Sequence, residues 1–271
     1  MMRTPNPLSA VLDAAERSGR LNLCTQDIRA AMPGVSADAL RQALHRQQRR
    51  GRVIRLSRGS DHWLIVPLQH SDAGAPPLET WLDRYMTKTL GIPYYVALLS
   101  AAETYGASPY AVMVTQVMVP ERRRPITVGR HEVVFHTCAR IKHMPSQWHE
   151  TPDGRLRVST PELTALELVE REALLGGMGR VREVLRELWA SCTPKGLATA
   201  LEAMREIPTA QRLGALLTLD DRAALASRVA DWLRDKPLRL VPLEHRQTPR
   251  SSEIDAVFKV RLPADQGSAN T

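Results

Sequence analysis

Residues 36–59 read SADALRQALHRQQRRGRVIRLSRG and decide the fold that is predicted for the N-terminal region. Between residues 41 and 59 there are seven arginines, one histidine and no acidic side chain. Ser36 is a favoured residue at a helix N-cap, which predicts a helix that begins just after it. The runs 53–56 and 62–66 are rich in β-branched and aromatic residues and flank a loop that contains glycine, which predicts a β-hairpin. The segment therefore predicts a cationic helix followed by a cationic hairpin.

The residues before this helix extend the pattern toward the N-terminus. Ser9 can cap a first helix, and Leu21 and Leu23 fit a short strand. Thr25 can cap a second helix over 26–32, which Pro33-Gly34 would end. The order helix, strand, helix, turn, helix and hairpin predicts a winged helix-turn-helix over residues 1–70.

The helix after Ser36 has two chemically different faces. Leu40, Ala43, Leu44 and Gln47 share one face at helical spacing, and the polar side chains share the other. A helix of this kind fits the major groove of duplex DNA, and arginines on the hairpin can reach phosphates. We expect Arg41, Gln42, His45, Arg46 and Arg49 to face the groove, Arg52, Arg55 and Arg58 to hold phosphates, and Arg50 to belong to the same DNA-binding set.

The basic charge is concentrated at the N-terminus. Residues 1–70 hold 11 arginines, no lysine and 5 acidic residues, for a charge of +6, whereas the remaining 201 residues carry only +2. Aromatic residues make up 4% of the chain, which argues against binding single strands by base stacking. Two other interpretations of the N-terminal region remain open: a merely solvated helix face, and a winged helix that contacts proteins.

The segment 67–77 is rich in turn-forming residues and predicts a linker or surface loop. It precedes a predicted α+β domain over residues 78–271, a larger mixed domain whose C-terminal half is mostly helical. The expected elements are helices over 78–90 and 94–105, strands over 112–119, 126–128 and 133–141, a turn at 152–154, a helix that starts at Ser159-Thr160-Pro161-Glu162, and late strands over 238–243 and 254–260.

Two groups of side chains were considered as reactive or metal sites. His131, His136, Cys138, His143 and His149 form a loose group, in which His131 and His136 fit the zinc-ligand spacing H-x₄-H. On an extended strand this odd offset points the two side chains to opposite faces, so no metal site and no cofactor are predicted. Glu132, Glu150 and Asp153 lie near strands, as a Mg²⁺-dependent nuclease needs, but no Glu-x-Lys or Asp-x-Lys lies beside them. A nuclease tethered by a winged helix is therefore kept only as the enzymatic alternative.

The sequence contains no apolar stretch long enough to span a bilayer. Cys24, Cys138 and Cys192 are far apart and odd in number, which favours a reducing compartment. We therefore expect a cytoplasmic protein without a membrane partner.

Two further segments add to the N-terminal pattern and the β-rich middle: YYVALLSAAETYG at 94–106 and VSTPELTALEL at 158–168. Together these features resemble the AbiEi-type antitoxins of bacterial type IV toxin–antitoxin, or abortive infection, systems. The resemblance implies a transcriptional autorepressor that binds operator repeats in its own promoter. It also implies that the second domain opposes a nucleotidyltransferase-like toxin, and it brings no catalytic or metal-binding residues, so no enzymatic activity is expected.

The way in which the toxin is opposed stays open at this stage. Direct binding, modification of the toxin or of tRNA, and indirect antagonism are all compatible with the sequence. A non-catalytic scaffold is the remaining alternative function.

Overall fold

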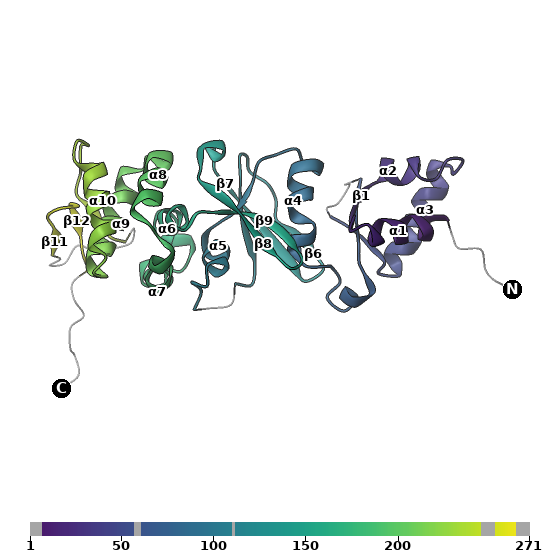
Figure 1. Ribbon diagram of the computed structural model, residues 1–271, viewed down its shortest axis with the longest axis horizontal. Coiled ribbons are helices and arrows are strands. Elements are labelled where there is room, and N and C mark those ends of the chain that lie inside the picture. Colours follow the sequence, from purple (N-terminus) through teal and green to yellow (C-terminus); the bar gives the residue numbers. More distant parts are fainter. Residues whose placement is uncertain (1–6, 57–60, 110–111, 245–252, 264–271) are drawn as a thin grey trace, which may run out of the picture. The chain divides into compact units, whose positions relative to one another are not determined.

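The computed structural model describes residues 7–56, 61–109, 112–244 and 253–263 (Figure 1). The chain divides into two compact units whose segments alternate along the sequence. The first unit comprises residues 1–94, 113–139 and 148–157, and the second comprises residues 95–112, 140–147 and 158–271. Helices and several sheets make up the described residues, which confirms the predicted α+β class.

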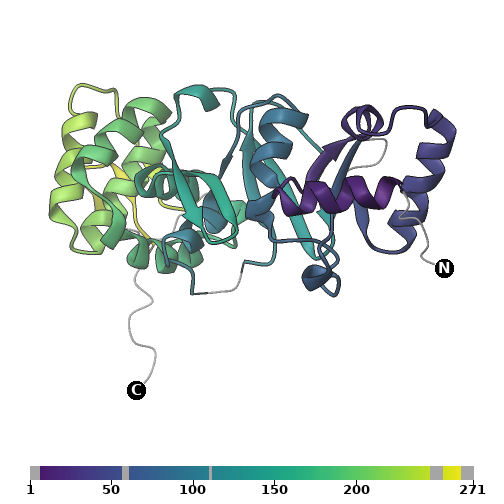
Figure 2. The same ribbon diagram turned by 45° about the vertical axis from the view of Figure 1, so that its right-hand side comes forward.

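The N-terminal part of the first unit, residues 7–65, contains three helices and a short sheet, in the order that the sequence predicts. Its elements are α1 (Pro7–Arg17), β1 (Asn22–Cys24), α2 (Thr25–Ala30), α3 (Ala37–Arg49), β2 (Val53–Arg55) and β3 (His62–Ile65). Strand β3 lies between β1 and β2 and pairs antiparallel with both. Figure 2 shows the helices of this part, in purple to dark blue, gathered around the sheet.

Apolar side chains from each of the three helices and from the strands form one core. Leu12, Ile28, Leu44 and Trp63 are among its buried members. Ser36 caps α3 by accepting a hydrogen bond from the Ala39 amide at 3.2 Å, as its position predicts.

The first two helices begin earlier than expected. Ser9 lies inside α1 because the helix begins at Pro7. Proline fits the first turn of a helix, since the backbone N–H that it lacks would have no partner within the helix there. Cys24 rather than Thr25 caps α2: the Cys24 thiol accepts from the Asp27 amide, and the Asp27 carboxylate accepts from the Cys24 amide.

The residues expected to form a linker or surface loop are held against the turn at Gly129-Arg130. The 3₁₀ helix η1 (Leu68–His70) begins the segment. Arg130 donates from its amide to the Ala73 carbonyl (3.1 Å) and from its guanidinium to the Asp72 carbonyl (3.0 Å). Gly129 has a φ of +60°, and a Cβ there would lie 2.7 Å from the Ala73 oxygen. The close approach of the two backbones therefore requires glycine at this turn.

The helix expected over 78–90 is broken into short pieces. They are η2 (Leu78–Thr80), α4 (Leu82–Arg84) and the π-helical turn η3 (Tyr85–Thr89). The break occurs at Trp81, whose φ of −135° is not helical.

Strands β5 (Thr115–Val119), β6 (Ile126–Val128) and β7 (His131–Thr137) lie side by side in a six-stranded sheet, in the order β6-β7-β5. β7 pairs parallel with β5 and antiparallel with β6. Gly129-Arg130 forms the predicted turn between β6 and β7. β8 (Ser146–Thr151) and β9 (Gly154–Ser159) are neighbours joined by the predicted turn at 152–154.

In the second unit, the predicted helix over 94–105 is shorter than expected. Tyr95 and Val96 form the strand β4 (Tyr95–Val96), in which Val96 pairs parallel with Val158, and α5 (Leu98–Thr104) follows. Aromatic and β-branched residues pack well in a strand, and here that preference overrides the helix start expected at Pro93.

The helix α6 (Pro161–Glu170) is buried along almost its whole length. Thr160 caps it, accepting from the Leu163 amide at 3.4 Å, and Pro161 takes the first turn, as predicted. Glu162 has an additional role: its Oε1 accepts from the amide (2.8 Å) and hydroxyl (3.0 Å) of Thr193, at the start of α8 (Pro194–Met204). The box Ser-Thr-Pro-Glu therefore starts α6, as predicted, and also joins it to α8.

The second unit contains further helices. They are η5 (Glu172–Leu174), α7 (Met178–Leu188), η6 (Trp189–Ser191), α9 (Ile207–Leu219) and α10 (Ala223–Leu233), and η4 (Ile141–His143) precedes β8. Asp220, whose side chain is 4% exposed, accepts hydrogen bonds from Arg182, Arg186 and Trp189 and so ties α7 to the end of α9.

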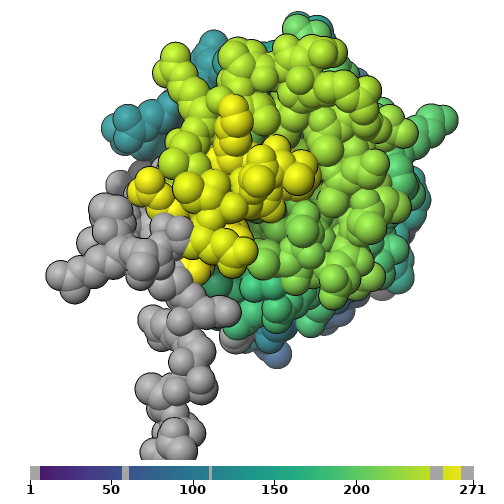
Figure 3. Space-filling model, turned by 90° about the vertical axis from the view of Figure 1, so that its left-hand side faces the viewer, coloured from purple at the N-terminus to yellow at the C-terminus, as the bar shows by residue number. Residues whose placement is uncertain are grey.

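The late strands are shorter than predicted: β10 (Val241–Pro242), β11 (Ile254–Asp255) and β12 (Val260–Arg261). They lie against α9, where the Gln211 amide donates to the carbonyls of Arg239 (2.8 Å) and Phe258 (2.6 Å). Figure 3 shows this segment, in yellow, covering green helices. Each helix in the described ranges is too short or too polar to traverse a lipid bilayer.

Candidate nucleic-acid interface

Helix α3 has one buried face and one exposed polar face, as its periodicity predicts. Leu40, Ala43, Leu44 and Gln47 are buried. Arg50, just after the helix, is exposed. The five side chains expected at the groove are also all exposed: Arg41, Gln42, His45, Arg46 and Arg49.

An acidic residue also lies on this face, close to the helix start. Asp38 pairs with Arg41, and the two side chains are 75% and 72% exposed. Exposed pairs of this kind contribute about 0–1 kcal/mol, so Arg41 can exchange its partner for a phosphate or a base at little cost.

Arg52 faces inward, which the sequence did not reveal. Its guanidinium donates to Asp13 at 2.7 Å and also to Glu16, both on α1. It is 26% exposed and donates further to the Val66 carbonyl at 3.4 Å. Arg52 therefore fixes the hairpin to α1, and its donors are already engaged within the protein.

Arg55 on the hairpin differs from Arg52. Arg55 is exposed on β2, and its guanidinium lies 4.6 Å from the centre of the Trp63 ring. Trp63 is itself held by a hydrogen bond from its indole nitrogen to the Thr25 hydroxyl (3.0 Å). Arg55 is thus presented on a fixed aromatic support. Arg58 lies outside the described residues.

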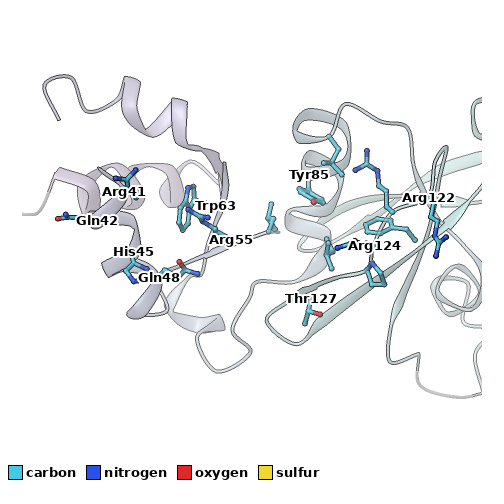
Figure 4. Close-up of a pocket in the computed structure, with 16 residues that line it drawn as sticks. Arg41, Gln42, His45, Gln48, Arg55, Trp63, Tyr85, Arg122, Arg124 and Thr127 are labelled. Atoms are coloured by element: carbon cyan, nitrogen blue, oxygen red, sulfur yellow. The ribbon is translucent and has the colours of Figure 1, made fainter. Parts of the chain in front are cut away.

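A cleft of about 1350 Å³ opens beside this face of α3 within the first unit. Figure 4 shows Arg41, Gln42, His45 and Arg55 on one side and Arg122, Arg124 and Thr127 on the other. The full lining is Arg41, Gln42, His45, Gln48, Arg55, Leu56, Trp63, Tyr85, Leu90, Arg122, Arg123, Arg124, Pro125, Ile126, Thr127 and Phe135.

The lining holds five arginines, one histidine and no acidic residue. Charge of one sign in a concave surface with low-dielectric walls focuses the potential and attracts polyanions. Arg122 to Arg124 come from the segment between β5 and β6, and sequence analysis missed them. The signal was present, because ERRRP at 121–125 is a run of three arginines, but only the fold brings it next to α3.

The side chains considered for metal binding do not converge. In the ranges that the structure describes, no three His, Cys, Asp or Glu side chains come together in a group that could hold a metal ion. Glu132 lies on β7, Glu150 on β8 and Asp153 in the turn that follows, so the carboxylates considered for a nuclease do not form such a group.

Comparison with known proteins supports the resemblance drawn from the sequence. Residues 95–219 match the family model of the AbiEi antitoxin C-terminal domain, which confirms the resemblance over this segment. A crystal structure of the RV2827C protein from Mycobacterium tuberculosis is similar in fold, with a TM-score of 0.66 and 17% sequence identity. The alignment covers 96% of this chain and 92% of that chain. No curated protein matches the sequence. The matched segment includes Arg122 to Arg124, whereas α3 lies outside it.

Proposed function

We propose that this protein is an antitoxin that also represses its own promoter. The match of residues 95–219 to the AbiEi antitoxin C-terminal domain supports the antitoxin role in a toxin–antitoxin system. The protein binds double-stranded DNA at operator repeats through a winged helix-turn-helix over residues 1–70. Residues 78–271 oppose a nucleotidyltransferase-like toxin without catalysis. Duplex DNA as the partner implies that the protein acts in the cytoplasm.

The observation that carries the DNA proposal is the one-signed cleft and the exposed face of α3 beside it. A helix of this size fits the major groove of B-DNA, where arginine reads guanine and glutamine reads adenine with paired hydrogen bonds. Arg41, Gln42, His45 and Arg46 occupy the exposed face that would read bases. The winged helix-turn-helix places its recognition helix in this way.

Phosphate contacts come from the C-terminal end of α3, from the hairpin and from the opposite wall of the cleft. Arg49, Arg50 and Arg55 are exposed on or just after α3 and on the hairpin, and Arg58 belongs to the same proposed set. Residues 122–124 add three arginines on the opposite wall. Arg52 is left out of these contacts because Asp13 and Glu16 already hold it. Phosphate contacts fix the register of the protein on the duplex and carry no sequence information.

The two activities can be separated in cells. A chain with Arg41, Arg46 and Arg49 all changed to Ala keeps its buried α3 face and its antitoxin domain. We expect it to lose repression of a reporter under its own promoter and still rescue cells that express the cognate toxin from another promoter. The matched control changes the exposed Arg222 and Arg228 of the second unit to Ala and retains both activities.

Two results would contradict the proposal. Full repression by the triple variant would show that α3 does not read the operator DNA. Rescue of growth by a chain that ends at residue 70 would show that residues 78–271 are not the antitoxin.

A further inference from the structure

The cleft has an apolar part that duplex DNA does not explain. Leu90, Pro125, Ile126 and Phe135 line it together with the arginines, and none of the four is fully buried. A duplex backbone presents sugars and phosphates, while its bases are stacked inside the helix. An apolar surface next to arginines suits a ligand that has both an exposed flat ring and negative charge.

Arg123 gives a second indication of a ligand. Its residue is half-buried, and its Nε is fully buried without a hydrogen-bond partner. A buried guanidinium donor that lacks an acceptor is unfavourable, and such groups in folded proteins call for an explanation. An anion bound in the cleft would supply the missing acceptor.

We propose that the cleft is a binding site for a nucleotide. Its base lies on the apolar wall around Phe135, and its phosphates are held by Arg122, Arg123 and Arg124. Aromatic surfaces bind nucleobases by stacking, and arginine matches phosphate oxygens with paired donors.

The nucleotide site shares its lining with the proposed DNA-reading face, because Arg41, Gln42 and His45 line the same cleft. A nucleotide bound there competes with duplex DNA, and linkage requires each ligand to weaken the other by the same factor. This competition rests on the proposed function, whereas nucleotide binding itself does not. The cleft thus allows the nucleotide pool to relieve repression.

The test is isothermal titration calorimetry of the full chain with ATP and with GTP. Adenosine and tripolyphosphate serve as half-ligands, which present the ring alone and the charge alone. We expect at least one of the two nucleotides to bind at least tenfold more tightly than either half-ligand.

Two variants locate the site. Arg123→Ala removes the unpartnered guanidinium, and Phe135→Leu removes the aromatic ring while keeping an apolar side chain. Each should weaken nucleotide binding by about tenfold, the order expected for one charge-assisted contact or one stacking partner. Arg228→Ala, an exposed arginine outside the cleft, should leave binding unchanged. If Phe135→Leu fails to fold, Arg123→Ala together with the tripolyphosphate comparison still decides the question.

Three results would overturn the proposal. Neither nucleotide binds, or tripolyphosphate binds as tightly as the nucleotide, or Arg123→Ala binds the nucleotide as tightly as the parent does. A gel shift with promoter DNA on the same samples keeps the two claims apart. DNA binding without nucleotide binding overturns this inference and leaves the proposed function standing. Nucleotide binding without DNA binding overturns the proposed function and the competition, and leaves the nucleotide site standing.

Discussion

A buried carboxyl in the antitoxin domain makes the stability of the fold depend on pH. Glu167 lies in the middle of α6, and the Tyr95 hydroxyl donates to its Oε1 at 2.6 Å. Its Oε2 is buried and has no hydrogen-bond partner. Burial raises the pKa of Glu167 from 4.5 to about 8, because the hydrogen bond from Tyr95 and the charge of Arg171 offset only part of the lost hydration.

The sign of the effect follows from proton linkage. Between pH 4.5 and about 8, the folded protein keeps a proton on Glu167 that the unfolded chain has released. The free energy of unfolding therefore falls as the pH rises through this window, by about 1.4 kcal/mol for each pH unit, and by roughly 5 kcal/mol at most. Below pH 4.5 both states hold the proton, and the contribution no longer changes.

Glu167→Gln replaces the carboxyl by a neutral group of the same shape that still accepts from Tyr95. We expect urea denaturation to give the variant and the parent similar free energies of unfolding at pH 5. At pH 8 the variant should be more stable by several kcal/mol. Glu187→Gln, an exposed change on α7, should follow the pH dependence of the parent. Equal pH slopes for Glu167→Gln and the parent would refute this account of the buried carboxyl.

Three other outcomes can be checked with single variants. Asp220→Asn should cost about 2–4 kcal/mol in urea denaturation, since it removes a buried charge that accepts from Arg182, Arg186 and the buried Trp189. Asp231→Asn breaks only an exposed pair with Arg234 and should cost under about 1 kcal/mol. Gly129→Ala should destabilise the fold by at least about 2 kcal/mol, because the added Cβ meets backbone at 2.7 Å and φ is +60°. A loss below roughly 0.5 kcal/mol, the size of an ordinary surface change, would contradict the close approach. Arg46→Ala should relax base preference in a binding-site selection, while Arg55→Ala should weaken binding to every sequence alike, and identical effects would contradict this division of roles.

Local chemistry was enough to predict the elements whose causes lie within a few residues. The start of α3 at Ser36, the turn at Gly129 and the start of α6 at Thr160 each follow from one capping or turn residue. The two faces of α3 follow from spacing alone. Glu162 was predicted at a helix start for the same reason, but its contact with Thr193 depends on how two helices pack.

The remaining features depend on contacts between residues far apart in the sequence. In the sequence, Arg52 is indistinguishable from the neighbouring arginines that are exposed. Its pairing with α1 depends on how the hairpin and that helix pack. Tyr95 and Val96 fitted a helical pattern, and pairing with β9 made them a strand. Arg122 to Arg124 were visible as a run of charge, yet their place in the cleft depends on the path of the chain through the sheet. Spacing and propensity carry no information on such contacts.

The central claim is that the exposed arginines of α3, the hairpin and residues 122–124 form one DNA-binding surface. The most direct test is the affinity of the full chain for a duplex of its own promoter, measured over a series of salt concentrations. Seven arginines proposed to contact phosphates (Arg49, Arg50, Arg55, Arg58, Arg122, Arg123 and Arg124) predict a slope of log K against log salt of about −6, at roughly 0.9 for each contact. Changing the three arginines at 122–124 to Ala should reduce the slope to about −4. No binding, or a slope that this triple change leaves unaltered, would contradict the account.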